Sequence, residues 1–246
     1  MKLYIAVTDG RARETRFEPA WISYRVRGSR LYRARGAGGV RGGVMVVGIS
    51  GYTGGGVLSA LIEDIAAEIS RCGFSGVVLD AGNGDTRRSA SLANALSAAL
   101  APMPVFVPLS LGDGAPRTFV LLQTALSGGS LARHLTDAAA RFGVSRLALE
   151  CDRLRMDFRL PCPGGAGDEI DAARLDALLT ASPAPRVFFS EALCVNYFFR
   201  REGENRYMTL FDDAESLRRK LRLAESLGVA RAFLYYPHVS DILHRL

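Results

Sequence analysis

The sequence predicts an α/β protein of the (β/α)8 TIM-type barrel class, and three observations support this. Short apolar runs recur along the chain, and helical patterns stand between most of the later ones, as in parallel strands joined by right-handed crossovers. About eight such runs can be recognised, and closing them into a barrel leaves no exposed sheet edge. The length of 246 residues suits one barrel. We therefore expect a single domain over residues 1–246.

The expected elements alternate along the chain. Strands are expected at residues 3–7, 21–26, 44–49, 73–80, 105–109, 147–150, 187–191 and 232–236. Helices are expected at residues 58–71, 89–100, 130–142, 171–179 and 213–227. Residues 44–49 are continuously apolar, as in a parallel strand that is buried on both faces. The helices place apolar residues three and four positions apart, with Gly73 at one helix end and Ser130 as the N-cap of another.

Two segments are less regular than the rest. Residues 117–126 fit a strand or a helix equally well. The connection over residues 28–43 is rich in glycine and arginine and has no helical period. We therefore expect irregular crossovers in the early part of the barrel.

Acidic residues stand at the ends of three expected strands. Asp80 ends an apolar run and is followed by a glycine-rich loop, while Glu150 and Glu191 end later runs. A (β/α)8 barrel gathers the carboxyl ends of its strands on the face where such proteins carry their chemistry. Asp80, Glu150 and Glu191 are therefore the candidate catalytic residues.

Composition narrows the class of ligand. The net charge is +6, but nearly all basic residues are arginine, with Lys2 and Lys220 as the two lysines. This bias is typical of GC-rich coding, and no basic run is interleaved with aromatics in a recognisable module, so we expect no nucleic-acid partner.

No apolar run is long enough to span a membrane. The four cysteines are scattered, so we expect no metal site, no disulfide framework and no cofactor.

The location is a further expectation from the amino-terminal segment. Its apolar run is too short for a signal peptide and is followed at once by Asp9 and several arginines. We therefore expect a cytoplasmic protein.

Three stretches resemble one family. Residues 73–82 read Gly-Phe-Ser-Gly-Val-Val-Leu-Asp-Ala-Gly. They resemble the fourth-strand motif of glycoside hydrolase family 18, which includes chitinases and spore cortex-lytic enzymes: Gly-Phe-Asp-Gly-hydrophobic-Asp-hydrophobic-Asp-aromatic-Glu. Residues 210–236 are similar to the last helix and strand of those barrels, with Tyr235 at the position of a sugar-stacking tryptophan. Residues 21–26 resemble the second strand of the spore-associated branch. The resemblance implies a barrel that binds N-acetylglucosamine (GlcNAc)-containing glycan, and spore association as an alternative location.

The departures from the motif bear on activity. Its first two acids fall at Ser75 and Val78, its third at Asp80, and its proton-donating glutamate at Gly82. The family works by substrate assistance, in which that acid protonates the glycosidic oxygen. General acid catalysis is typically worth about 10²–10⁴-fold. The resemblance therefore implies a non-catalytic protein that binds peptidoglycan or a chitin-like glycan, or that acts as a scaffold for a protein partner. The alternative is an active glycosidase with relocated carboxylates roughly 5–10 Å apart.

The candidate ligand-binding residues are acids and aromatics near expected strand ends. They are Asp80, Asp152, Tyr24, Tyr235 and Tyr236. Aromatic rings can stack on sugar faces, but tyrosines at strand ends also serve as plain packing. Two other interpretations stay open: the acids pair with arginines such as Arg87, Arg153 and Arg155, or side chains close the barrel mouth altogether.

Overall fold

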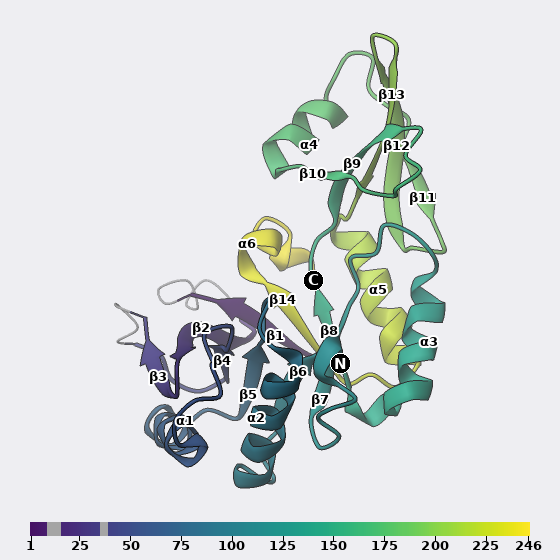
Figure 1. Cartoon of the computed structure of the whole chain (residues 1–246). Helices are drawn as coiled ribbons and strands as arrows, with labels where there is room; N and C mark the ends of the chain where they lie inside the picture. The colour runs from purple at the N-terminus through teal and green to yellow at the C-terminus, as the bar shows by residue number, and fades with distance from the viewer. Residues whose placement is uncertain (9–15, 35–38) are drawn as a thin grey trace.

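The computed structural model describes residues 1–8, 16–34 and 39–246. Eight parallel strands form a closed barrel (Figure 1). They are β1 (Lys2–Val7), β2 (Glu18–Arg27), β4 (Val44–Gly48), β5 (Gly76–Asp80), β6 (Val105–Pro108), β7 (Phe119–Gln123), β8 (Leu147–Cys151) and β14 (Arg231–Tyr235). Strand β1 pairs with both β14 and β2, which closes the sheet on itself. The predicted (β/α)8 class is confirmed, and the strand that ends at Asp80 is the fourth of the barrel.

Helices cover the outside of the later strands. They are α1 (Leu58–Cys72), α2 (Thr86–Ala99), α3 (Leu131–Phe142) and α5 (Ala214–Ser226). Helix α1 buries Leu61, Ile65 and Ile69 on one face, and Gly73 ends it in the left-handed conformation, with φ of 69°. The connection from β2 to β4 instead passes through β3 (Arg30–Arg33), which pairs antiparallel with β2. The irregular early crossover expected there is present.

An insertion separates β8 from α5. It contains β9 (Arg155–Leu160), β10 (Asp168–Glu169), α4 (Ala172–Leu179), β11 (Phe188–Ser190), β12 (Val195–Glu202) and β13 (Asn205–Phe211). Its strands form an antiparallel sheet in the order β10-β9-β13-β12-β11. In Figure 1 this inserted sheet rises above the carboxyl ends of the barrel strands.

The insertion corrects one predicted barrel strand. Residues 187–191 were expected in the barrel, but they form β11, an edge strand of the inserted sheet. The ambiguous residues 117–126 supply the missing barrel strand, β7. Glu150 therefore ends the seventh barrel strand rather than the sixth. A short run such as Val-Phe-Phe-Ser does not reveal which sheet it joins, because strand pairing depends on contacts far away in the sequence.

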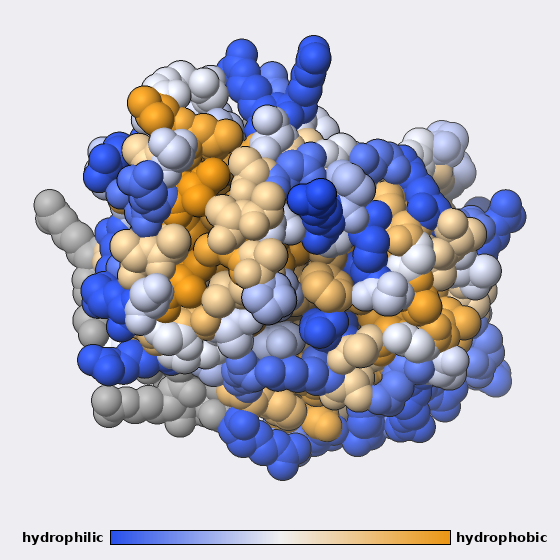
Figure 2. All heavy atoms as spheres, turned by 90° about the horizontal axis from the view of Figure 1, so that it is seen from below, coloured by the Kyte–Doolittle hydropathy of each residue, from blue (hydrophilic) through white to orange (hydrophobic). Residues whose placement is uncertain are grey.

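Two apolar layers hold the barrel together. Inside the strands, Tyr4 stacks on Phe233 with ring centroids 4.7 Å apart, and Phe106 meets Phe233 at 5.0 Å. A larger cluster fills the space between the strands and the helices. Figure 2 shows the surface at the amino-terminal end of the strands, where hydrophilic residues cover much of the face and hydrophobic residues gather at its upper left. The lower interior is thus a packed core, as in other barrels of this class.

A buried ion pair joins the insertion to the barrel. Lys220 on α5 donates to Asp212, just after β13, at 2.7 Å, and both side chains have no exposed area. Asp212 also accepts hydrogen bonds from Ser216 Oγ at 2.7 Å and from the backbone N–H of Leu154 at 2.9 Å. Leu154 precedes the insertion and Asp212 follows it, so this cluster ties the two ends of the insertion to α5.

No helix in the described part of the chain has the length and apolar character needed to cross a lipid bilayer.

Candidate functional site

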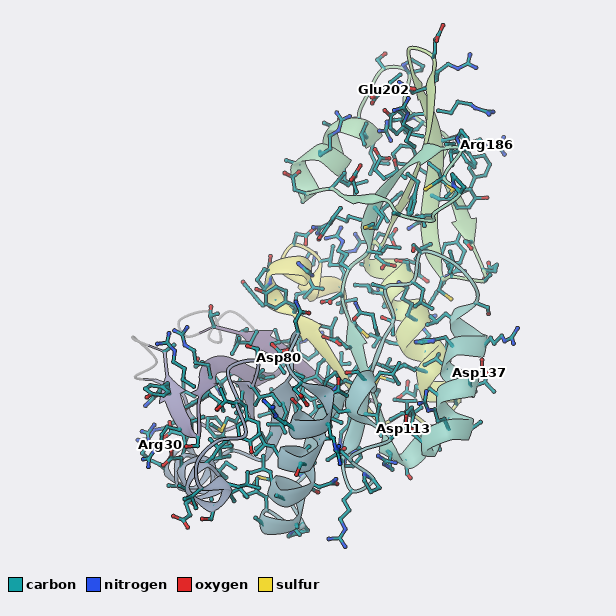
Figure 3. All side chains as sticks on the ribbon, viewed as in Figure 1. Arg30, Asp80, Asp113, Asp137, Arg186 and Glu202 are labelled. Atoms are coloured by element: carbon teal, nitrogen blue, oxygen red, sulfur yellow. The ribbon has the colours of Figure 1, made fainter. Side chains whose placement is uncertain are left out.

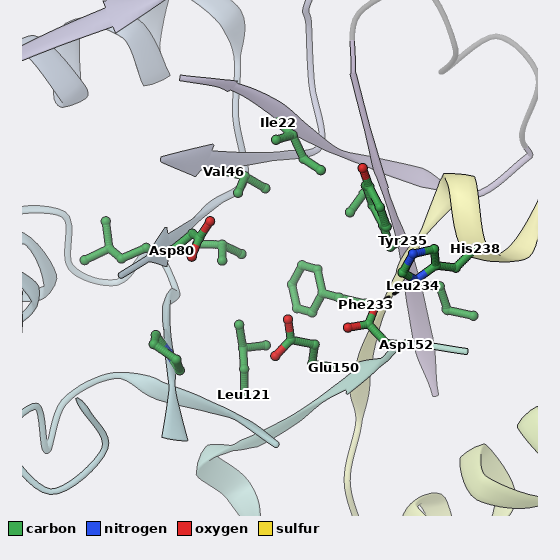
Figure 4. A pocket seen from close by; sticks show the side chains of 14 residues that line it. Ile22, Val46, Asp80, Leu121, Glu150, Asp152, Phe233, Leu234, Tyr235 and His238 are labelled. Carbon is green, nitrogen blue, oxygen red and sulfur yellow. Dashed lines mark ion pairs between the residues drawn. The ribbon is translucent and has the colours of Figure 1, made fainter. Parts of the chain in front are cut away.

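A cavity of about 350 Å³ opens at the carboxyl ends of the barrel strands. Its wall is largely apolar, and five polar side chains reach it: Asp80, Glu150, Asp152, Tyr235 and His238. Figure 4 shows Asp80 on one side, with Asp152, Tyr235 and His238 across from it and Glu150 between. Figure 3 places Asp80 at the top of the barrel, below the inserted sheet. The mouth is therefore open, and the interpretation in which side chains close it does not hold.

Asp80 ends β5 and is held by the turn that follows it. Its side chain is exposed, and its Oδ1 accepts a hydrogen bond from the Gly82 N–H at 3.1 Å. Gly82 has a backbone φ of +48°, in a region that residues other than glycine rarely adopt. A Cβ at this position would meet Ser50 at an ordinary 3.5 Å. The backbone conformation, rather than lack of space, therefore opposes a glutamate at position 82.

Glu150 on β8 is the most perturbed acid of the cavity. Its pKa is raised from 4.5 to about 7, first by burial and then by the negative charges of Asp152 and Asp80. Within the described ranges neither Asp80 nor Glu150 forms an ion pair. With a pKa of about 7, the Glu150 carboxyl is protonated in part of the molecules at neutral pH.

Two of the three arginines expected to pair with the acids, Arg153 and Arg155, are engaged elsewhere. Arg153 forms an ion pair with Asp241 at 2.7 Å and donates to the Asp212 carbonyl. Arg155 donates to the carbonyl of His238 at 3.3 Å. These arginines hold the loops around the mouth and leave its acids unneutralised.

His238 completes the opposite wall. It lies on the short helix α6 (Tyr236–Val239), directly after the last barrel strand. Its Nδ1 is 3.5 Å from Asp152 Oδ1, and its ring meets Tyr235 edge-on at 4.8 Å. Sequence analysis did not single out His238, although its place just beyond the final strand was an available signal. Asp152 and Tyr235, in contrast, lie at the cavity as expected.

Two expected site residues lie away from the cavity. Glu191 follows β11 in the insertion, is 83% exposed, and pairs with Arg219 at 3.4 Å. Tyr24 is buried on the outside of the barrel, where its hydroxyl is 3.9 Å from the Cys72 sulfur. Burial and a hydrogen bond to Glu68 raise the pKa of Tyr24 well above its ordinary value. Both residues are removed from the candidate site.

Tyr236 also lies outside the cavity lining and packs against the main core. Tyr236 begins α6 whereas Tyr235 ends β14, so the two side chains point in different directions. In the parts of the chain that the structure describes, no group of three or more His, Cys, Asp or Glu side chains is placed to hold a metal ion.

Comparisons with solved structures show that the barrel fold of this chain is similar to that of spore cortex-lytic enzymes and chitinases. No family model and no curated protein sequence matches the chain. The spore cortex-lytic enzyme SleL of Bacillus cereus has a TM-score of 0.70 and 12% identity, covering 99% of this chain and 74% of that one. A class V chitinase from Nicotiana tobaccum has a TM-score of 0.68 and 12% identity, covering 98% and 96%.

A third similar structure comes from another Bacillus species. The putative sporulation-specific glycosylase YdhD of Bacillus subtilis has a TM-score of 0.61 and 11% identity, covering 94% of this chain and 88% of that one. The chain thus shares the barrel fold of these chitinases and cortex-lytic proteins, which the resemblance of residues 73–82 implied.

Proposed function

We propose that the barrel mouth binds a GlcNAc-containing glycan and does not hydrolyse it by the substrate-assisted route. The observation that carries this proposal is Gly82. It occupies the proton-donor position of the family motif, on a left-handed turn whose N–H is bonded to Asp80. The remaining carboxylate, Asp80, has no neighbour at position 82 that could protonate a glycosidic oxygen.

The cavity has the features that sugar binding needs. It combines an apolar wall with convergent polar groups, which is the usual make-up of a small-ligand site. Asp80 and Asp152 can accept hydrogen bonds from sugar hydroxyl or amide groups. Tyr235 adds an aromatic surface on the opposite side. Support by similarity comes from the tobacco class V chitinase, a mutant of which has been solved in complex with NAG4.

The test is a calorimetric titration with chitooligosaccharides and peptidoglycan fragments. We expect the wild-type protein to bind at least one of them. Asp80→Ala and Tyr235→Ala should each weaken binding by about tenfold, since each removes a direct contact worth roughly 1–1.5 kcal/mol. Glu191→Ala is the control, because Glu191 is exposed and lies outside the cavity. A wild-type protein that binds none of these ligands would remove the proposal.

A second candidate function is supported by Glu150. A protonated Glu150 could donate to a leaving group while the side chain of Asp80 or Asp152 acts as base or nucleophile. Because the pKa of Glu150 is about 7, such an activity should fall as pH rises above neutrality and should be lost in Glu150→Gln. The measurement is release of reducing ends between pH 5 and 8 (a range around that pKa). Absence of turnover by the wild-type protein over this range excludes the glycosidase.

A further inference from the structure

One face of the inserted sheet carries a row of aromatic side chains. Phe188 on β11 lies opposite Tyr197 on β12, and Phe199 follows on the same face two residues later. The ring centroids are 5.4 Å apart for Phe188–Tyr197 and 5.7 Å apart for Tyr197–Phe199. Helix α4 packs through Leu175 and Leu178 against the other face.

Two aromatic side chains of this row are exposed to solvent. Phe199 is 52% exposed and Phe188 is 37% exposed. They are two of the seven large apolar side chains that are exposed in the described part of the chain. Apolar exposure that gathers on one surface indicates an interaction site, whereas scattered apolar residues do not.

Arginines continue the row at both ends. Arg201 lies two residues beyond Phe199 and directly opposite Arg206 on β13, while the guanidinium of Arg186 lies 5.0 Å from the centre of the Phe188 ring. A pocket of about 450 Å³ lies at the hairpin end, lined in part by Phe199, Arg201 and Arg206. We call Phe188, Tyr197, Phe199, Arg186, Arg201 and Arg206 the aromatic–arginine face.

The charges on this face are not neutralised by any of the residues that the structure describes. Over the described ranges, none of its three arginines forms an ion pair, whereas Arg200 on the other face binds Asp157 at 2.6 Å and Glu202 at 3.0 Å. Like charges directly opposite each other in a β-ladder are destabilising. An anion bound between Arg201 and Arg206 would relieve this repulsion, and the two side chains lie beside exposed apolar surface.

We propose that the aromatic–arginine face binds an acidic peptide segment of a protein partner. Carboxylates would pair with the guanidinium groups, and apolar side chains of the same segment would cover Phe188 and Phe199. A second copy of the chain is a poor occupant, because the protein itself carries a net charge of +6. Sugars and nucleobases stack on free ring faces, and Phe188 offers few: Tyr197 stacks on it at an interplanar angle of 25°, and the Arg186 guanidinium lies 5.0 Å from its ring centre.

The site is independent of the glycan-binding proposal. No residue of this face lines the mouth cavity. Substitutions here should therefore leave chitooligosaccharide titrations unchanged, and failure of one proposal does not affect the other.

The experiment measures binding by fluorescence anisotropy with two labelled probes, poly-glutamate and a Glu/Leu/Phe-rich peptide, and with a Gln-for-Glu version of that peptide. We expect the wild-type protein to prefer the Glu/Leu/Phe peptide over the Gln version by at least about tenfold, with binding that weakens as salt is added. The double variant Arg201→Glu/Arg206→Glu should lose about tenfold or more in affinity for this peptide. Phe199→Ser, which leaves the charge unchanged, should also weaken it.

The matched control is Arg133→Glu/Arg222→Glu. It changes the net charge by the same amount at two exposed helix positions, where the side chains are 83% and 65% exposed. We expect this variant to retain most of the binding, and melting curves check that all variants fold. The proposal is overturned if neither acidic probe binds, if both double variants lose affinity equally, or if single-stranded RNA binds this face more tightly than the peptides do.

Discussion

Replacing Lys220 by methionine should lower the free energy of unfolding by about 3–5 kcal/mol. The substitution keeps most of the volume of the side chain but leaves Asp212 as a fully buried carboxylate without its cation. Asp212 would retain Ser216 Oγ and the Leu154 N–H as hydrogen-bond donors, which offset part of its desolvation. Urea unfolding followed by circular dichroism measures the loss.

The chain offers a matched control at its other lysine. Lys2 pairs with Glu18 but is 51% exposed, and exposed ion pairs are worth about 0–1 kcal/mol. Lys2→Met should therefore change the stability by less than about 1 kcal/mol. Equal effects of the two substitutions would show that the buried pair does not anchor the insertion.

The barrel could be predicted because local signals agree with the overall fold. The apolar run before Asp80 forms the fourth barrel strand, and Ser130 accepts a hydrogen bond from Arg133 N–H as the N-cap of α3. Asp213 caps α5 in the same way. Each of these features depends on neighbours within a few residues, which is the range over which sequence patterns are informative.

The insertion could not be predicted in the same way. Its strands carry polar and apolar residues on both faces, as in Asn205–Phe211, without a clean apolar face. Their pairing is fixed by contacts between β9 and β13, which are about fifty positions apart in the chain. The placement of residues 187–191 in the barrel was wrong for this reason.

The site was predictable where the side chain ends a barrel strand. Asp80, Glu150 and Tyr235 end strands and meet at one cavity. Tyr24 does not reach the cavity. The pairing register between β2 and β4 shifts between Ile22 and Tyr24, so Ile22 lines the cavity whereas Tyr24 packs outside the barrel. Such a bulge depends on the neighbouring strand and leaves no reliable mark on the sequence.

Replacing Glu150 by glutamine should stabilise the protein above neutral pH and have little effect near pH 4.5. The folded-state pKa of Glu150, about 7, lies above the ordinary 4.5, so the native state binds the proton more tightly than the unfolded state does. Stability contributed by this group is therefore present at low pH and is lost as pH rises from about 4.5 to about 7. The glutamine variant does not titrate, and its advantage should grow to about 3 kcal/mol at most by pH 8.

Urea unfolding of both proteins across this pH range measures the difference. Glu191→Gln is the control, because the 83% exposed carboxyl of Glu191 should give a difference that hardly varies with pH. Parallel stability curves for the wild-type protein and Glu150→Gln would contradict the assignment of Glu150 as a half-buried acid with a raised pKa.

The same variant separates structure from function at the barrel mouth. A carboxyl that lowers stability at neutral pH does not help to hold the barrel together, so we infer that Glu150 serves the ligand proposed for the cavity. If Glu150→Gln gains stability above neutral pH and also loses affinity for chitooligosaccharides, one side chain accounts for both effects. If it gains stability while binding is unchanged, the ligand contacts lie with Asp80, Asp152 and Tyr235 on either side of it.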